Sequence, residues 1–384
     1  MRFPEFSGEW EMVSLQDIAT INPKSDPLQN TFIYIDLEAV EKGELRKIQE
    51  IMREEAPSRA QRVIDNNDIL FQCVRPYQKN NYIHRILNTS NQQWVASTGY
   101  AQIRTTELPN YIYHLLNTDE FNRKVMVRCT GSSYPAINSE DLATIHLYYT
   151  PDKKEQLKIS RLLDLLDKRI ATQNKIIEKL QSLIKGLSQQ LLSSENDWIL
   201  YRLDDLAQIK SGYSGTQVSY QTPYKVSRIE TISKHCIDIQ RIGYVECIPE
   251  SYRLNVGNIL FSNINSIQYI GNTAYLDKDY GLYHGMNLLR IIPNTTIVRP
   301  RFLHLLLCTD WAINHFQTIC NKAVSQASIN QTALGKSRFP IPPMSVQQQI
   351  CSMFELTERK LDNEQEYISC LQQQKRYLLQ KMFI

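Results

Sequence analysis

The chain has 384 residues, of which 42% are hydrophobic and 22% are charged, and its formal net charge is +3. This length accommodates two ordinary domains with connecting elements, and the proportions are typical of a soluble globular protein. No run of eighteen apolar residues occurs, which excludes a membrane-spanning helix of ordinary length. The eight cysteines are scattered without a CxxC pair, which argues against a zinc ribbon or a disulfide framework and favours the cytoplasm.

The first half predicts short mixed elements followed by one long helix. Strands are expected over 31–37, 63–74 and 94–103, and a helix over 111–127. Thr150 and Pro151 then offer an N-cap followed by proline at the first helical position. The following segment steps by alternating four and three residues, the a/d pattern of a coiled coil, at Ile159, Leu163, Leu166, Ile170, Gln173, Ile177, Leu180, Ile184, Leu187 and Leu191.

The second half predicts the same order of elements. Strands are expected over 226–239, 258–264 and 285–292, and a helix over 301–320. Ser345 with Gln348 resembles a capping box, and a second heptad segment over 350–382 keeps the frame of the first, 191 residues later. It is the more polar of the two segments, so we do not expect it to pair with a copy of itself.

Internal duplication is the strongest signal in the sequence. The segment 10–21 recurs at 198–209, where Trp10, Leu15 and Asp17 return as Trp198, Leu203 and Asp205. Further matches keep their order with small drifts in spacing: Asp68-Ile-Leu-Phe71 with Asn258-Ile-Leu-Phe261, His114-Leu-Leu116 with His304-Leu-Leu306, and Ile137-Asn138 with Ile329-Asn330. The order of the matches excludes chance, so the chain is expected to contain two copies of one domain, each followed by a helix.

Motifs for catalysis are incomplete in this sequence. Asn22-Pro23-Lys24 lacks the second proline and the aromatic residue of an adenine-methyltransferase loop. Gly335-Lys336-Ser337 imitates the end of a P-loop, but Asn330 stands where the first glycine is required. Pro151-Asp152 lacks the Glu-x-Lys partner of a nuclease motif, and single histidines such as His114 and His304 are expected in the core. We therefore predict that the chain has no catalytic residue, no metal site and no cofactor of its own.

Two long stretches contain no acidic residue. The first, 69–106, holds four cations with five aromatic residues interleaved, and the second, 311–354, holds three lysines and arginines. A face without carboxylates can approach phosphates, so both stretches favour contact with DNA. The alternative is a polar surface that merely lacks acids.

The ordered strings resemble a known family, the specificity (S) subunits of type I restriction–modification systems, over nearly the full length of the chain. In the first half the resemblance rests on Pro57-Ser58-Arg59-Ala60-Gln61-Arg62, Asp68-Ile-Leu-Phe71, Val74-Arg75-Pro76-Tyr77, Ala96-Ser97-Thr98-Gly99 and the segment 130–137. In the second half it rests on Ile341-Pro342-Pro343 with Gln347 and Gln348, and on the closing segment 378–383. The second half departs from the first, because it lacks the Ser-Arg-Ala and Arg-Pro strings.

The resemblance implies an α+β fold with a pseudo-twofold internal repeat. Two α/β target-recognition domains, 1–150 and 196–342, would be separated by two long helices, 151–195 and 343–384, that form an antiparallel coiled coil. The implied partners are double-stranded DNA with a bipartite, asymmetric target, two modification (methyltransferase) subunits, and restriction subunits; no membrane is involved. S-adenosylmethionine would belong to the modification subunits, and ATP and Mg to the restriction subunits. Two alternatives stay open: a DNA-reading subunit of another methyltransferase system such as type IIB, and a coiled-coil scaffold that joins two protein-binding domains.

The candidate DNA contacts follow from these strings and from polar chemistry. Arg and Lys bind phosphate or guanine, and Asn and Gln can bind adenine through two hydrogen bonds. In the first domain the candidates are Arg59, Arg62, Arg75, Tyr77, Gln78, Lys79, Asn80, Thr98, Gly131, Ser132, Ser133 and Tyr134. In the second domain they are Asn263, Asn265, Gln268, Tyr269, Ser325, Gln326 and Ser328. The alternative for Arg75 is an ion pair with a carboxylate of its own domain.

Overall fold

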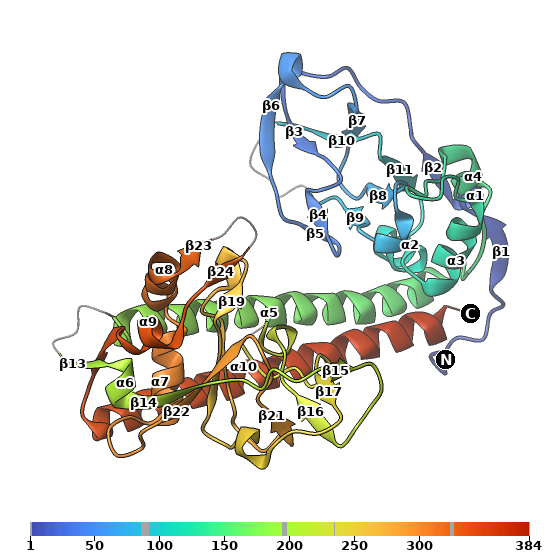
Figure 1. The fold of residues 1–384 in the computed structure, drawn as a ribbon. Coiled ribbons are helices and arrows are strands. Elements are labelled where there is room, and N and C mark those ends of the chain that lie inside the picture. The colour runs from blue at the N-terminus through green and yellow to red at the C-terminus, as the bar shows by residue number, and fades with distance from the viewer. Residues whose placement is uncertain (1, 86–91, 194–197, 234, 323–325, 384) are drawn as a thin grey trace. The chain divides into compact units, whose positions relative to one another are not determined.

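A computed structural model of the chain describes residues 2–85, 92–193, 198–233, 235–322 and 326–383. The chain forms two compact units, Met1–Lys175 with Gln365–Ile384, and Ile176–Glu364. Two 39-residue helices, α5 (Lys153–Leu191) and α10 (Met344–Met382), each contribute a segment to both units (Figure 1). None of the described helices is both long enough and apolar enough to cross a lipid bilayer.

The first unit contains two four-stranded sheets, ordered β6-β3-β10-β7 and β2-β11-β8-β9, and a ribbon of β1 with β12. Strands β3 and β10 run parallel, whereas β7 and β10 run antiparallel. The strands are β1 (Glu11–Ser14), β2 (Ala19–Ile21), β3 (Thr31–Ile35), β4 (Val40–Glu41), β5 (Glu44–Leu45), β6 (Gln49–Met52), β7 (Ala60–Ile64), β8 (Ile69–Gln72), β9 (Tyr82–Ile83), β10 (Gln93–Ser97), β11 (Tyr100–Thr105) and β12 (His146–Tyr149). The short helices are α1 (Leu15–Ile18), α2 (Pro109–Leu116), α3 (Asp119–Arg128) and α4 (Ser139–Ala143).

The predicted elements of the first half are present, but three of them are divided. The segments 63–74 and 94–103 each contain two strands joined by a turn rather than one strand. The helix expected over 111–127 is interrupted between α2 and α3, because the Thr118 side chain accepts a hydrogen bond from the Phe121 N–H at 3.2 Å and starts a new helix.

The second unit repeats this layout with sheets β14-β22-β18-β20, β15-β17-β16-β21 and β19-β24-β23, and a ribbon of β13 with β25. Its strands are β13 (Ile199–Arg202), β14 (Ala207–Ser211), β15 (Gln217–Val218), β16 (Tyr224–Val226), β17 (Gly243–Val245), β18 (Ile259–Ser262), β19 (Ile264–Asn265), β20 (Thr273–Tyr275), β21 (Leu282–Tyr283), β22 (Leu288–Pro293), β23 (Asn321–Lys322), β24 (Ala327–Ser328) and β25 (Arg338–Ile341). Its short helices are α6 (Leu203–Leu206), α7 (Pro300–Leu307), α8 (Asp310–Ile319) and α9 (Gln331–Gly335).

Two predictions for the second half are corrected. The strand expected over 226–239 is wrong, because β16 ends at Val226 and a 3-10 helix, η3 (Ile229–Ile232), follows. The helix expected over 301–320 is two helices, α7 and α8, and the second of them is capped by the Thr309 side chain.

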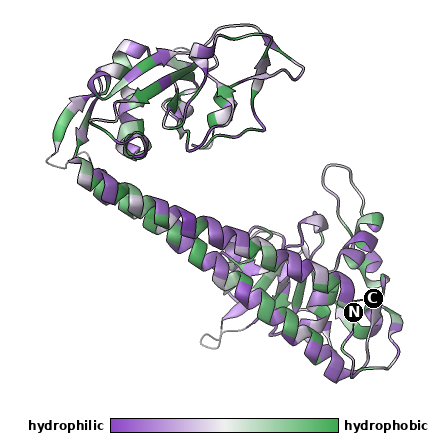
Figure 2. Ribbon diagram, turned by 90° about the horizontal axis from the view of Figure 1, so that it is seen from below, coloured by the Kyte–Doolittle hydropathy of each residue, from purple (hydrophilic) through white to green (hydrophobic). Residues whose placement is uncertain are grey.

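The two long helices run antiparallel to one another in each unit. In the first unit Met382 and Phe383, from the end of α10, share a core with Ile159 and Leu163, from the beginning of α5. In the second unit the beginning of α10 packs where α5 ends, with Phe354 in one core with Leu187 and Leu191. Figure 2 shows apolar and polar residues alternating along both helices, as the heptad pattern predicts.

Both predicted helix starts are corrected in detail. The Asp152 carboxylate accepts a hydrogen bond from the Lys154 N–H at 2.8 Å, so Asp152 rather than Thr150 caps α5. Helix α10 begins at Met344, which places Ser345 inside the helix and rules out the expected capping box.

The duplication extends to side-chain contacts. In the first half the Leu108 N–H donates to Gln156 Oε1 at 3.3 Å, and in the second half the Arg299 N–H donates to Gln347 Oε1 at 2.7 Å. Each glutamine lies in the first turns of a long helix and accepts a hydrogen bond from the backbone N–H of the N-cap residue of a short helix, α2 or α7. The same hydrogen bond therefore joins the α/β part of each half to the long helix that follows it.

Candidate DNA-contacting surfaces

The loop after β8 has an unusual backbone. Its 3-10 helix, η2 (Pro76–Gln78), lies between Arg75 and Lys79, whose φ angles are +54° and +52°. Left-handed conformations of this kind are uncommon for residues other than glycine and cost on the order of 1 kcal/mol or more each. The Arg75 N–H donates to the Pro135 carbonyl at 2.8 Å. The conformation of the loop is therefore imposed by the segments that surround it.

Three of the predicted DNA contacts in this loop are bonded within the domain. Gln72 Nε2 donates to Gln78 Oε1 at 2.9 Å, and Asn80 Oδ1 accepts from the backbone N–H of Lys42 at 3.0 Å. Lys79 Nζ lies 2.6 Å from a carboxylate oxygen of Asp119. These side chains hold the loop in place, and the ammonium group of Lys79 is already neutralised.

The second predicted segment, 130–136, lies directly beside the first. Thr130 and Ala136 exchange both backbone hydrogen bonds at 2.9 Å, and the Ile137 N–H donates to the Cys73 carbonyl at 3.1 Å. Gly131 has a φ of +90°, and a Cβ atom there would lie 2.9 Å from the carbonyl oxygen of Tyr134. The turn therefore requires glycine at this position.

The two segments meet at a stacked pair. The guanidinium carbon of Arg75 lies 4.4 Å from the centre of the Tyr134 ring, a cation–π contact, and Tyr134 is 64% exposed. Tyr77 in the same loop is 51% exposed. Among the described residues no carboxylate pairs with Arg75, so the alternative of an ion pair within the domain is wrong for Arg75. Lys79, in the same loop, makes an ion pair with Asp119. The stack leaves guanidinium N–H groups available to a base edge or a phosphate.

The other first-domain candidates belong to the 130–136 turn, to β7 with the residue before it, and to the turn after β10. Ser132 and Ser133 are exposed in the turn. Arg59 is exposed at the start of β7, and its carbonyl accepts the Thr98 N–H at 2.9 Å. Arg62 is half-buried on β7, and its Nε atom has no hydrogen-bond partner.

The second-domain candidates also come together. Strand β19 pairs with β24, which places Asn265 opposite Ala327 and Ile264 opposite Ser328. The 3-10 helix η5 (Ile267–Tyr269) follows β19 and carries Gln268 and Tyr269, which is 47% exposed. Gln326 is exposed, whereas Ser325 lies outside the described residues.

Two second-domain asparagines have internal roles. Asn265 Nδ2 donates to Ser262 Oγ at 3.1 Å, and its Oδ1 accepts the Ser266 N–H at 2.8 Å. The Asn263 carbonyl accepts the Ile329 N–H at 2.9 Å, while its side-chain Oδ1 is enclosed without a partner. Asn265 therefore shapes the turn that presents Gln268 and Tyr269.

Sequence reasoning missed the residues that support the first loop. Asn122 Nδ2 donates to the Pro76 carbonyl at 3.0 Å, and Asp119 binds Lys79. Both belong to α3, some forty positions further along the chain. No local signal in the sequence links them to the loop, since only the packing of α3 against η2 brings them together.

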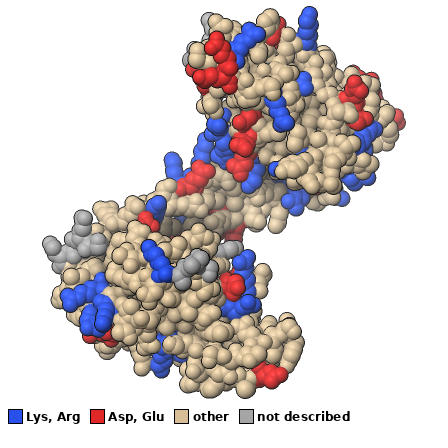
Figure 3. All heavy atoms as spheres, turned by 45° about the horizontal axis from the view of Figure 1, so that its top comes forward, with Lys and Arg blue, Asp and Glu red and all other residues tan. Residues whose placement is uncertain are grey.

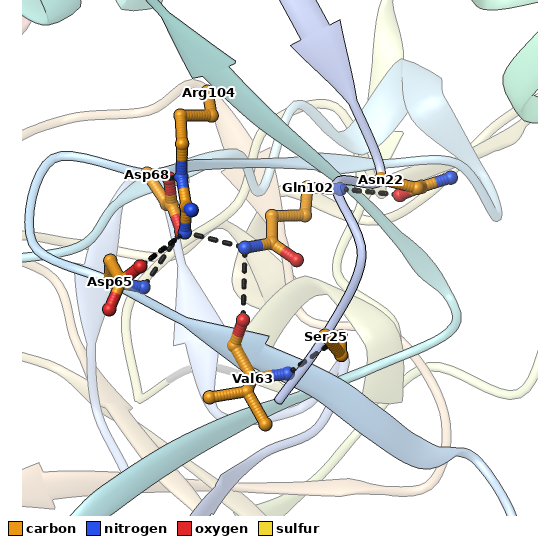
Figure 4. A network of polar contacts seen from close by, with 7 residues as sticks. All are labelled: Asn22, Ser25, Val63, Asp65, Asp68, Gln102 and Arg104. Carbon is orange, nitrogen blue, oxygen red and sulfur yellow. Dashed lines mark hydrogen bonds and ion pairs between the residues drawn. The ribbon is translucent and has the colours of Figure 1, made fainter. Parts of the chain in front are cut away.

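The conspicuous titratable groups of both domains have structural partners. Asp68, 1% exposed, accepts hydrogen bonds from Gln102 and Arg104 at 2.7 to 2.8 Å in the network of Figure 4. His304 lies 3.5 Å from Cys308 Sγ, but burial lowers the pKa of His304 to about 3 and raises the pKa of Cys308 to about 11. At neutral pH this pair is an uncharged imidazole beside a thiol, not an activated nucleophile.

Charge is distributed rather than concentrated on the surface. In the face shown in Figure 3, Lys and Arg side chains are interspersed with Asp and Glu, with wide uncharged areas between them. Among the described residues no group of three or more His, Cys, Asp or Glu side chains is placed to hold a metal ion. The candidate surfaces therefore depend on a few individual cations and on aromatic and amide groups.

The chain is similar to known proteins of one family. The family model described as the type I restriction modification DNA specificity domain matches the chain twice, at residues 7–182 and 195–373. The type I restriction enzyme MjaX specificity subunit of Methanocaldococcus jannaschii is 38% identical over 193 residues, 49% of this chain and 45% of that protein. The HindI specificity subunit of Haemophilus influenzae is 23% identical over 186 residues, 47% and 37% of the two chains. The matches span less than half the length of these curated relatives.

Solved structures share the fold over nearly the whole chain. A chain from a type I R-M system, studied for its complex assembly and conformational transition, aligns over 97% of both chains with 19% identity and a TM-score of 0.63. The type I restriction-modification S subunit from M. genitalium aligns over 98% of this chain and 96% of its own, with 14% identity and a TM-score of 0.61. Since the family model covers most of the sequence in two copies, the chain belongs to the type I restriction–modification DNA specificity family.

Proposed function

We propose that the chain is the DNA sequence-specificity subunit of a type I restriction–modification complex. Each recognition domain reads one half of a bipartite, asymmetric duplex target. The chain docks two modification subunits, and restriction subunits where they are present, and these partners carry out the catalysis in the cytoplasm. In this proposal S-adenosylmethionine belongs to the modification subunits, ATP and Mg belong to the restriction subunits, and the chain itself holds no cofactor.

One observation carries the proposal: the same backbone scaffold presents different side chains in the two domains. The hydrogen bond from the Ile137 N–H to the Cys73 carbonyl in the first domain corresponds to the one from the Ile329 N–H to the Asn263 carbonyl in the second. In the first domain this scaffold carries the stack of Arg75 on Tyr134, and in the second it carries amides and hydroxyls. Equivalent positions with different hydrogen-bonding groups suit one duplex read at two places with two different half-sites.

Methylation mapping in cells tests this proposal. The modified adenine motif is sequenced with the wild-type chain, without the chain, and with the Arg75→Ala and Gln268→Ala variants. We expect the motif to vanish without the chain, Arg75→Ala to relax one half-site, and Gln268→Ala to relax only the other. A base-reading contact contributes about 1–3 kcal/mol of discrimination, or roughly 5- to 150-fold. Loss of specificity in both half-sites from a single variant would contradict independent reading by the two domains.

The purified chain distinguishes this proposal from its rivals. A DNA reader loses affinity for duplex DNA steeply as salt rises, whereas a coiled-coil scaffold for two protein-binding domains shows no such binding. With S-adenosylmethionine and target DNA but without partners, we expect no methyl transfer. Reproducible turnover by the chain alone would refute its role as a non-catalytic subunit.

A further inference from the structure

Arg62 differs from the paired cations of the first domain, because it is half-buried and has no counter-ion. Arg104 is paired with Asp68, and Lys79 is paired with Asp119. No such pair includes Arg62 among the described residues, and its enclosed Nε atom lacks any hydrogen-bond partner. The undescribed stretch of this domain, 86–91, contains no Asp or Glu that could supply a carboxylate.

The position of Arg62 is fixed by the sheet. It lies opposite Ala96 on β10, and its neighbour Val63 is bonded on both sides, to Ser25 Oγ at 3.3 Å and to Gln102 Nε2 at 3.0 Å (Figure 4). Side chains alternate along a strand, so Arg62 shares the face of Ile64, which belongs to a buried core. The stem of Arg62 therefore crosses apolar surface between the sheets.

The guanidinium group of Arg62 interacts electrostatically with Cys73, the residue that follows β8. Its charge acts on the thiol of Cys73, and Cys73 is the residue whose carbonyl holds the 130–136 turn through Ile137. Burial in turn lowers the pKa of Arg62. Placing a charged group in such surroundings without a partner is unfavourable. An anion that binds the guanidinium group offsets the cost of the unpaired charge.

We propose that Arg62 binds a phosphate of the DNA backbone and positions the first domain on the duplex, while Arg75 and its neighbours read bases. This inference rests on the proposed function. A phosphate oxygen satisfies a guanidinium group through charge-assisted hydrogen bonds, and the exposed Arg59, next to Thr98 at the same edge of β7, adds a second cation for the same backbone. A contact of this kind carries no sequence information.

The second domain has no cation at the position equivalent to Arg62. Strand β21 corresponds to β10, and there the His284 N–H donates to the carbonyl of Tyr252, the residue at the position of Arg62. The ring of Tyr252 packs against Tyr213 with ring centres 5.3 Å apart. The phosphate contact at this position of the scaffold is therefore confined to the first domain.

The test needs no knowledge of the target sequence, because a phosphate contact acts on any duplex. The full chain, Arg62→Met and Arg62→Lys are titrated by fluorescence anisotropy with two unrelated duplexes from 0.05 to 0.3 M salt. One phosphate contact changes the slope of log affinity against log salt by about 0.9. We expect Arg62→Met to reduce the slope by about that amount and to weaken binding about 8-fold at 0.1 M salt, equally for both duplexes. Arg62→Lys should retain the slope.

A matched control and a stability measurement separate this role from a structural one. Arg46→Met removes an equal charge from the same domain, but Arg46 is exposed and lies 3.0 Å from Glu44 Oε2, so duplex affinity should stay unchanged. Methionine fills the site of Arg62 without a buried charge, so the thermal midpoint of Arg62→Met should equal or exceed that of the wild-type chain.

Each contrary result has a distinct meaning. A lower thermal midpoint with unchanged duplex affinity would make Arg62 structural, and an altered methylation motif would make it a base reader. Loss of binding to the modification subunits, with duplex affinity retained, would assign its counter-ion to a partner protein. Any of these would overturn the inference while the proposed function stands. Failure of the wild-type chain to bind duplex DNA in a salt-dependent way would overturn both.

Discussion

Buried histidines should make the second domain sensitive to acid. His304 on α7 is 5% exposed, and its Nδ1 lies 3.1 Å from Nη1 of Arg301. Arginine only donates, so Nδ1 must accept, and the neutral ring carries its proton on Nε2. Burial, together with the charge of Arg301, lowers the pKa of His304 to about 3. Burial likewise lowers the pKa of His284, 1% exposed, to about 4.

The magnitude follows from proton linkage. In the unfolded chain a histidine has a pKa of about 6.5, so at pH 5 the unfolded state binds nearly one proton at each site and the folded state almost none. A histidine that is neutral in the folded state makes its full contribution to stability at pH values above its pKa in the unfolded chain. This contribution is lost as the pH falls from that value toward the pKa of the histidine in the folded chain. Between pH 8 and pH 5 each histidine should remove about 2 kcal/mol from the free energy of unfolding. His284 and His304 together should remove about 4 kcal/mol.

Denaturation of the full chain at pH 8 and pH 5 measures this difference. In His304→Gln the amide can still accept from Arg301 but does not titrate, so the pH-dependent loss should shrink by about 2 kcal/mol, or roughly 4–8 °C in the unfolding midpoint at pH 5. His146→Gln, at an exposed site on β12, should leave the loss unchanged. If His304→Gln does not fold, His284→Asn provides the same comparison. If both variants lose as much unfolding free energy between pH 8 and pH 5 as the wild-type chain, the buried histidines are not the origin of the acid sensitivity.

Three further predictions concern the first domain and the long helix. Asp68→Ala should lower the free energy of unfolding by about 2 kcal/mol, and Asp68→Asn by less, because the one amide oxygen can keep only the bonds that a single carboxylate oxygen accepts from Gln102 and Arg104, as urea denaturation will measure. Gly131→Ala should destabilise the 130–136 turn by about 1 kcal/mol or more and weaken duplex binding, whereas Gly186→Ala, with open space around it in α5, should stabilise the chain by about 0.5–1 kcal/mol. Lys79→Ala should weaken duplex binding less than Arg75→Ala, because the Lys79 charge is already paired. Equal losses of duplex affinity in the two variants would show that the ion pair of Lys79 with Asp119 breaks when the chain binds DNA.

The sequence predicts the repeated organisation of this chain well, because the signals are long and mutually consistent. A heptad pattern over some forty residues determines a helix almost regardless of context, and α5 and α10 lie where it indicates. Shorter elements depend on single residues. Thr118 and Thr309 each divide a predicted helix by capping the next one, at equivalent places in the two halves. The segment 226–239 looks extended from its β-branched residues, yet it leaves the sheet after Val226.

The candidate surfaces were predictable as segments but not as individual contacts. Polarity places Gln78, Lys79 and Asn80 in a loop, and chemistry alone makes all three good ligands for DNA. The structure assigns them to internal bonds, with partners such as Asp119 that are distant in sequence. The stack of Arg75 on the exposed Tyr134 likewise joins residues almost sixty positions apart. Long-range pairing of this kind leaves no periodic signal in one sequence.

The architecture of the two surfaces separates stability from specificity. The bonds that join the paired segments run between backbone groups, from Ile137 to Cys73 and from Ile329 to Asn263, and such bonds do not depend on side-chain identity. The side chains exposed beyond them can therefore change without loss of the scaffold, provided that the turn keeps residues such as Gly131 whose backbone geometry is required. Two copies of this scaffold in one chain can diverge independently, because each is held by its own backbone bonds and its own short helices. Under the proposed function, an asymmetric reader then needs no new fold, only different side chains on two equivalent loops.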